Sequence, residues 1–222
     1  MLTPRMSSIV SLLGYNDTVA DIGCDHGKLS AYLVKNDLAN KVFATDISLP
    51  SLEKAKKLKE KEKLNNISFY LGDGFSCLSE KPDAAVVAGM GGQVIADIID
   101  HPFAKAKLVL QPMKDSDILF EKLCLSGFKI EKEVIVREGG RFYEIILACP
   151  GTEKPFDFSL PKMDVLLKNE DALLFLKHKK TVLQKALKGS QNAISEEGKL
   201  RLNELNKKIK MIDEVIVNAY GK

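Results

Sequence analysis

The sequence has few cysteines and no arrangement of them that would hold a metal ion. Its four cysteines, Cys24, Cys77, Cys124 and Cys149, are scattered, and no two of them form a CxxC pair. We therefore expect reduced thiols in a cytosolic protein, with neither a metal site nor a disulfide framework. No apolar run is long enough for a membrane span, and the N-terminus has no basic-then-apolar signal pattern. The sequence thus predicts a cytoplasmic protein that does not enter a membrane.

Net charge is also small, at +3 for 222 residues, but it is unevenly divided. Residues 1–150 carry 19 basic and 20 acidic side chains, whereas residues 151–222 carry 14 and 10. A basic C-terminal part is a modest indication of a polyanionic partner. A lysine-rich helical surface that only faces solvent explains the same charges, and charge alone favours that explanation.

Strand and helix patterns alternate over the first 150 residues. The predicted strands are 19–22, 42–46, 67–71, 84–88 and 108–111, and the predicted helices are 6–13, 28–35, 50–63, 93–99 and 116–126. Two further strands, 129–137 and 142–149, flank a Gly-Gly pair that is typical of a hairpin turn. We therefore predict an α/β fold with a seven-stranded mixed sheet, parallel except for a terminal antiparallel hairpin.

The C-terminal part is predicted to be helical. Residues 151–161 contain glycine and prolines and are interpreted as a linker, after a first domain of residues 1–150. Within residues 162–222, leucine and isoleucine recur at spacings of three and four over the helices 170–188 and 195–218. That pattern predicts a coiled-coil helical hairpin, with a connection at 189–193. The leucines and isoleucines of this pattern pack between the two helices. Any contact with a polyanion is therefore expected from lysines on the exposed faces, such as Lys177, Lys180 and Lys207.

The most informative segment follows the first strand, where the chain reads Asp21-Ile22-Gly23-Cys24-Asp25-His26-Gly27. A strand that turns on glycine into a helix places backbone N–H groups at the carboxyl edge of a sheet, where nucleotide-like ligands bind. A carboxylate in this turn repels pyrophosphate. The segment therefore predicts a nucleoside ligand without phosphates, with Asp25 and His26 facing a second substrate.

Three more strand ends place polar residues or glycines on the same edge. Asp46 is positioned to bind ribose hydroxyls, and Asp73 lies between two glycines and can accept a hydrogen bond from an adenine amino group. Residues 88–92, Ala-Gly-Met-Gly-Gly, allow a ligand to approach the backbone closely. The predicted nucleoside contacts are Asp21, Gly23, Cys24, Asp46, Ile47, Asp73, Gly74, Gly89 and Met90.

Together these motifs resemble the bacterial tRNA (adenine-22-N1)-methyltransferases over essentially the whole chain. The resemblance rests on the segments around Asp25 and Met90, on Gln111-Pro112, on Leu2 to Arg5, and on the hairpin 138–144. It implies a class I S-adenosylmethionine-dependent methyltransferase core, S-adenosylmethionine as the donor, and N1 of an adenine in the D-arm region of tRNA as the acceptor. The chain departs from the family pattern at Gly27, where alanine is usual, and at Met113, where asparagine is frequent.

The resemblance also implies roles for residues near the acceptor. Adenine N1 has a free lone pair, so no proton must be removed before it attacks, but the methylated base becomes cationic. We assign Asp25, His26 and Gln111 to the catalytic side, where they stabilise that charge or orient the base. His26 is interpreted as an orienting residue ahead of a proton-transfer role. Arg5 either contacts a tRNA phosphate or pairs with an acidic residue.

Alternative functions remain open at the level of sequence. One is a methyltransferase of another RNA, a protein or a small molecule, with the C-terminal helices as a lid or dimerisation element. Another is an RNA-binding module without enzymatic activity. An NAD-binding protein is disfavoured by Asp25 and by the terminal hairpin, because the sixth strand of a dinucleotide-binding fold is parallel. For the main interpretation we expect a monomer that binds tRNA.

Overall fold

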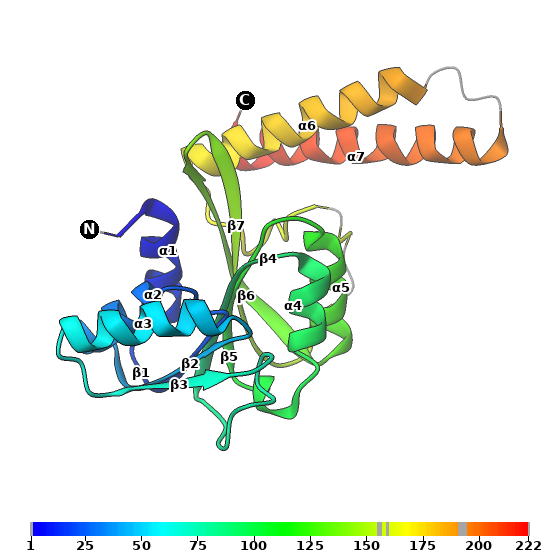
Figure 1. Cartoon of the computed structure of the whole chain (residues 1–222). Coiled ribbons are helices and arrows are strands. Elements are labelled where there is room, and N and C mark those ends of the chain that lie inside the picture. The colour runs from blue at the N-terminus through cyan, green and yellow to red at the C-terminus, as the bar shows by residue number, and fades with distance from the viewer. Residues whose placement is uncertain (1, 155–156, 159, 191–194, 222) are drawn as a thin grey trace. The chain divides into compact units, whose positions relative to one another are not determined.

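The computed structural model describes residues 2–154, 157–158, 160–190 and 195–221. The chain divides into two compact units, Met1–Val165 and Leu166–Lys222, which are treated separately below (Figure 1). Residues 155, 156 and 159 of the predicted linker, and residues 191–193 of the predicted helix connection, lie outside the described residues.

The first unit is built on a seven-stranded sheet in the order β3-β2-β1-β4-β5-β7-β6. The strands are β1 (Asn16–Ile22), β2 (Ala39–Asp46), β3 (Ile67–Leu71), β4 (Ala84–Met90), β5 (Lys107–Pro112), β6 (Phe128–Glu138) and β7 (Arg141–Pro150). β1 to β5 pair in parallel, and β7 lies antiparallel between β5 and β6. The predicted mixed sheet with a terminal hairpin is confirmed.

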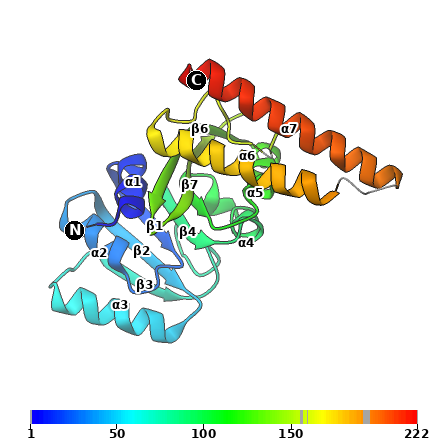
Figure 2. The ribbon, with the colours of Figure 1, turned by 90° about the horizontal axis from the view of Figure 1, so that it is seen from above.

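Five helices cover the two faces of this sheet (Figure 1, Figure 2). They are α1 (Pro4–Leu13), α2 (Lys28–Lys35), α3 (Leu49–Lys61), α4 (Gly92–Ile98) and α5 (Ser116–Leu125). Ile9 of α1, Leu29 of α2 and Leu52 of α3 join one buried cluster, whereas Ile95 of α4 and Leu119 of α5 join the other. Because helices bury both faces, the central strands are continuous apolar runs, as their sequences predicted.

β1 and β2 each begin three residues before the predicted strands, and two helices also begin earlier than predicted because of their caps. α1 begins two residues before the predicted helix because Thr3 caps it, with its side chain accepting from the N–H of Met6 at 3.4 Å, and because Pro4 suits the first turn. Ser48 caps α3 in the same way. A short 3-10 helix, Pro102–Ala104, was not predicted, because three residues carry no periodic pattern.

The hairpin between β6 and β7 turns on the glycines that predicted it. Glu138 pairs with Arg141, so the loop has two residues, and Gly139 and Gly140 have φ values of +59° and +78°. Positive φ at both positions is the geometry that favours glycine in the tightest hairpin loops.

The segment after β7 is held against β6. The buried carboxylate of Glu153 accepts from the N–H of Ile130 at 3.0 Å and from Nζ of Lys162 at 2.7 Å. The N–H of Lys162 in turn donates to the fully buried Glu133 at 2.9 Å. The bond from Ile130 lies at the irregularity of β6 between Ile130 and Lys132.

The second unit is a pair of long helices, α6 (Glu170–Ser190) and α7 (Glu196–Tyr220), which run antiparallel (Figure 2). Ser195 caps α7 by accepting from the N–H of Gly198 at 3.1 Å, as its position predicted. Lys180 of α6 pairs with Asp213 of α7 at 2.5 Å. The predicted C-terminal helical hairpin is confirmed.

Candidate functional site

A cavity of about 660 Å³ opens at the carboxyl ends of the parallel strands. Residues after β1, β2, β3 and β4 line it, together with the start of α1 and residues of α4. A ligand crevice at this edge is the general expectation for an open α/β sheet. The cavity wall brings together all nine predicted nucleoside contacts, namely Asp21, Gly23, Cys24, Asp46, Ile47, Asp73, Gly74, Gly89 and Met90. Arg5, Asp25 and His26 line it as well.

The turn after β1 is closed by its own hydrogen bonds. The N–H groups of Gly23 and Cys24 both donate to the carbonyl of Thr45, at 2.8 and 2.9 Å. The N–H of Asp25 donates to Asp46, and that of Gly27 donates to the carbonyl of Cys24. Four N–H groups that were expected to face a ligand are therefore used within the protein. These four groups therefore shape the turn and do not serve as donors to a ligand.

Gly23 also leaves room for the side chain of Met90, from the neighbouring strand β4. Its φ is +70°, and a Cβ built there would lie 2.2 Å from Cε of Met90. Met90 therefore packs directly over the turn. Gly89 differs, because its φ is +81° and a Cβ there would meet no atom within 4 Å. Its backbone faces open space in the cavity wall, which a ligand can approach closely.

Asp46 is fixed at the end of β2. One carboxylate oxygen accepts from the N–H of Asp25 at 2.9 Å, and the other accepts from the N–H of Ser48 at 2.8 Å. Each carboxylate oxygen has a second lone pair, so the group retains capacity for the hydroxyls of a ribose. The exposed side chain of Ile47 follows it on the rim of the cavity.

Asp21 lies deeper and has a structural contact. Its carboxylate accepts from Oγ of Ser30 at 2.6 Å and from the N–H of Ser30 at 3.2 Å, which ties the end of β1 to α2. Burial raises the pKa of this carboxyl to about 6, and the nearby charge of Asp46 acts in the same direction. The hydrogen bonds from Ser30 offset part of that increase.

Cys24 is buried beside these two carboxylates. Burial raises the pKa of its thiol, and the charges of Asp21 and Asp46 raise it further. Its sulfur contacts the carbonyl of Asp25. The side chain is therefore a neutral thiol in the cavity wall.

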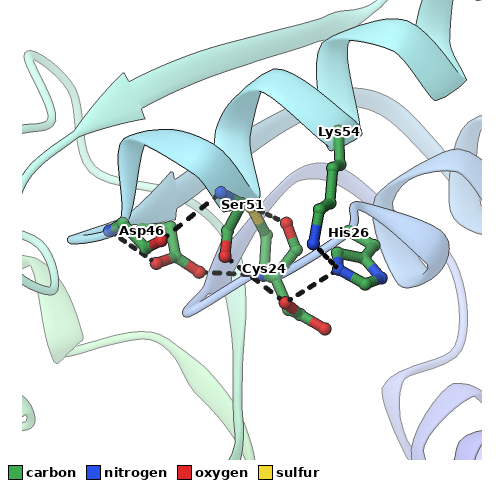
Figure 3. Close-up of polar contacts among 7 residues, drawn as sticks. Cys24, His26, Asp46, Ser51 and Lys54 are labelled. Atoms are coloured by element: carbon green, nitrogen blue, oxygen red, sulfur yellow. Dashed lines mark hydrogen bonds and ion pairs between the residues drawn. The ribbon is translucent and has the colours of Figure 1, made fainter.

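A polar cluster lies on the rim, where the turn meets α3 (Figure 3). Nε2 of His26 is 3.1 Å from Nζ of Lys54 and 3.6 Å from Oδ1 of Asp25. Oγ of Ser51 donates to the same carboxylate oxygen at 3.4 Å. Asp25 has a φ of +49°, in the left-handed region that residues other than glycine adopt rarely. The sequence did not indicate Ser51 or Lys54, because their proximity depends on how α3 packs beside the turn.

The far end of the cavity suits an adenine ring. Asp73 is exposed there, beside Gly74 and the apolar side chains of Val94 and Ile98 from α4. These four residues also line a second, smaller cavity of about 260 Å³ that adjoins the first. Val94 and Ile98 thus supply apolar surface beside the carboxylate of Asp73, and Asp97 also lines the smaller cavity. A carboxylate acceptor beside apolar surface suits an exocyclic amine on a flat ring.

The opposite end is formed by α1, by the end of β5 and by the start of β7. Nη1 of Arg5 donates to Oε1 of Gln111 at 3.0 Å, and its guanidinium carbon lies 5.1 Å from the centre of the Tyr143 ring. Gln111 is fully buried, and Nε2 donates to the carbonyl of Pro112 at 2.8 Å. Gln111 thus lies behind Arg5 and outside the cavity wall, while Met113 lines the wall and is 45% exposed.

The lysines predicted to meet a polyanion lie on the second unit. Lys177 of α6 and Lys207 of α7 are exposed, and Lys180 is half-buried in its pair with Asp213. Over the part of the chain that the structure describes, no helix is long and apolar enough to cross a membrane. Within that same part, no group of three or more His, Cys, Asp or Glu side chains is arranged to hold a metal ion.

Comparison with known proteins agrees with this architecture. The family described as "Methyltransferase domain" matches residues 2–146. A seven-stranded mixed sheet with a cavity at the carboxyl ends of its parallel strands is the framework of that family, so the chain is a methyltransferase by fold and sequence.

A closer assignment follows from relatives that align over nearly the whole chain. The tRNA (adenine(22)-N(1))-methyltransferase of Bacillus subtilis is 31% identical over 97% of this chain and 97% of its own length. The chain therefore belongs to the tRNA (adenine(22)-N(1))-methyltransferase family.

Solved structures agree with this assignment. The structure of the B. subtilis tRNA methyltransferase TrmK superimposes with a TM-score of 0.82 at 29% identity, covering 97% of this chain and 99% of that one. The Streptococcus pneumoniae protein Sp1610, solved in complex with S-adenosyl-L-methionine, gives a TM-score of 0.81 at 26% identity and covers 97% of this chain and 100% of that one.

Proposed function

We propose that this protein transfers a methyl group from S-adenosylmethionine to N1 of adenine 22 in tRNA. The observation that carries the proposal is the convergence of four strand ends on one cavity, in a chain whose relative with that name aligns over 97% of both lengths. The residues expected to contact the donor line this cavity together with Asp25 and His26 from the acceptor side, whereas Gln111 lies outside its wall.

The cavity has the features that the donor requires. Gly89 leaves open space where a side chain would otherwise stand, Asp46 has free lone pairs for ribose hydroxyls, and Asp73 can accept from the adenine amine. Ile47 and Ile98 supply apolar surface for the ring. When bound, S-adenosylmethionine supplies a methyl group activated by its sulfonium. The protein's remaining task is to hold the acceptor nitrogen in line with that methyl group.

Asp25 and His26 are proposed to act on the acceptor base. Nε2 of His26 lies 3.1 Å from Nζ of Lys54, which fixes the position of the ring. The imidazole can orient the exocyclic amine, and the exposed carboxylate of Asp25 can stabilise the positive charge that develops on the methylated ring. Gln111 is proposed to act indirectly, because it contacts Arg5 rather than the cavity.

The second unit is proposed to bind the tRNA body. Adenine 22 is stacked in folded tRNA, and exposing it costs a few kcal/mol. Contacts of Lys177, Lys180 and Lys207 with phosphates would offset that cost. We propose that the domains are residues 1–150 and 162–222 with a linker at 151–161, and that the protein acts as a cytoplasmic monomer.

The test is methylation of unmodified tRNA, with the product mapped at single-nucleotide resolution. We expect N1-methyladenine at position 22, and about 10²–10⁴-fold slower turnover for Asp25→Ala and His26→Ala, with donor affinity changed less than threefold. Asp117→Asn, which removes an exposed carboxylate of α5, serves as the matched control. Methylation at another nucleotide would contradict the assignment. Equal losses of turnover and donor affinity would place both residues in the donor site.

A further inference from the structure

The cavity wall offers no aromatic side chain on which a nucleobase could stack. Among the described residues that line it, none is Phe, Tyr or Trp. Enzymes that act on a base outside its helix hold that base between aromatic or apolar side chains. In this cavity the ring of an acceptor base must therefore meet aliphatic or thioether groups.

Three large apolar side chains in the described part of the cavity wall are exposed, namely Ile47, Val94 and Met113. Ile47 directly follows Asp46, and Val94 lines the smaller cavity together with Asp73. Both therefore belong to the part of the wall proposed for the ribose and the adenine of the donor. Met113 follows β5, and the proposed donor contacts give it no role.

Met113 lies on a side of the cavity that the donor's nucleoside leaves free. With its adenine beside Asp73 and its ribose beside Asp46, that nucleoside covers the ends of β3 and β2. The end of β5 is three strand spacings from β2, about 14 Å. It is two spacings, about 10 Å, from the end of β1, which Asp25 and His26 follow. A single purine ring can therefore reach both Met113 and this pair.

Both the backbone and the sulfur of Met113 are held by neighbouring residues. Its N–H donates to the carbonyl of Met90 at 2.8 Å, and Nε2 of the buried Gln111 donates to its sulfur at 3.5 Å. Methionine side chains are flexible, and these contacts restrict this one. A thioether is polarisable and makes favourable contacts with aromatic rings. A restricted thioether in the wall thus suits the ring of a purine.

We propose that Met113 contacts the ring of the acceptor adenine and holds it beside Asp25 and His26 during methyl transfer. This inference rests on the proposed function, since it assumes that an adenine of tRNA enters the cavity. It gives an apolar contact with the base to the position at which the chain departs from the family pattern. It also gives the buried amide of Gln111 a positioning role, through the sulfur of Met113.

The experiment measures methyl transfer and exposure of the base separately, on the full chain. Met113→Ala removes the thioether, whereas Met113→Leu keeps an apolar side chain of similar volume. kcat and KM are measured with unmodified tRNA. A second tRNA carries 2-aminopurine at position 22, and the fluorescence of this base rises when it leaves its stack. Calorimetry gives the dissociation constant of S-adenosylhomocysteine for each variant.

For Met113→Ala we expect kcat to fall about 5- to 30-fold, because a smaller fraction of the bound tRNA holds its adenine in the cavity. KM for tRNA should change less than threefold, since most of the tRNA binds elsewhere. The fluorescence rise of 2-aminopurine should shrink as well. The dissociation constant of S-adenosylhomocysteine should change less than threefold, and Met113→Leu should lie between Met113→Ala and the wild type in kcat.

Leu125→Ala, an exposed apolar residue at the other end of α5, is the matched control, and thermal unfolding of each variant checks folding. If Met113→Ala weakened S-adenosylhomocysteine binding as much as it lowered kcat, Met113 would belong to the donor site and the proposal would be wrong. It would also be wrong if KM alone rose, since Met113 would then contact another part of the tRNA, or if no quantity changed. If the wild type bound no S-adenosylhomocysteine or methylated no adenine at position 22, the proposed function itself would fail.

Discussion

At the scale of single residues, Asp21 links the site to the stability of the fold. The folded protein holds a proton on this buried carboxyl up to a pKa of about 6, whereas the ordinary value is 3.8. Between those values the folded state binds more protons than the unfolded state, so the free energy of unfolding falls as pH rises. The contribution at neutral pH is unfavourable by about 3 kcal/mol at most.

Asp21→Asn should remove that decline, because the amide oxygen still accepts from Ser30 and carries no charge to desolvate. We expect the stability of this variant relative to wild type to rise by about 2–3 kcal/mol between pH 4 and pH 6.5 and then to level off. Urea unfolding at half-unit pH steps measures it, with Asp117→Asn on the exposed face of α5 as the control. If the difference in stability between Asp21→Asn and the wild type did not vary with pH, Asp21 would not be the group that holds the proton in the folded state.

At the scale of elements, two adjacent glycines join the exit of β4 to the exit of β5. A Cβ at Gly92 would lie 2.0 Å from the carbonyl oxygen of Asp115, and the N–H of Gly92 donates to the carbonyl of Lys114 at 2.8 Å. Backbone cannot move aside as a flexible side chain can. The close approach of these two loops thus depends on the absence of a side chain at Gly92.

Gly92→Ala should therefore destabilise the protein by about 3 kcal/mol, through overpacking against backbone. Gly91→Ala is the matched control, since Gly91 has a φ of −68° and a Cβ there would meet only the flexible side chain of Lys114 at 3.4 Å. We expect this control to cost less than about 1 kcal/mol. Chemical denaturation measures the free energy of unfolding of both variants. If both lost the same amount, the loop at Asp115 would have moved to make room for the new Cβ at position 92.

The sequence predicted the order of the elements because each has a clear period and clear ends. It also predicted that residues such as Asp46 and Asp73 lie at one edge of the sheet, since parallel strands bring their carboxyl ends together there. Their contacts with a nucleoside stay a prediction. The sequence did not predict the contact between Arg5 and Gln111, which are 106 residues apart, or the approach of Lys54 to His26. Those contacts depend on strand order and on how α1 and α3 pack, which no local pattern specifies.

At the scale of the whole molecule, the division of charge between the two units becomes testable. The double variant Lys177→Gln/Lys207→Gln removes two exposed charges from α6 and α7 without touching the cavity. We expect tRNA affinity to fall about 3- to 10-fold at low salt, and the slope of log affinity against log salt to decrease by about 1–2. Fluorescence anisotropy with labelled tRNA measures both quantities.

Two further measurements complete this comparison. Binding of S-adenosylhomocysteine should be unchanged in the double variant, since the cavity lies wholly within the first unit. Lys35→Gln, which removes a lysine paired with Glu62, controls for a general loss of positive charge. An unchanged salt slope in the double variant would exclude these lysines as phosphate contacts.

The buried thiol of Cys24 has a chemical consequence once a methyl donor fills the cavity. A thiolate beside a sulfonium is a strong nucleophile and would compete with the intended acceptor for the methyl group. Burial and the neighbouring carboxylates raise the pKa of this thiol and keep it protonated. The same acidic wall that suits a cationic donor thus protects the enzyme from alkylating itself.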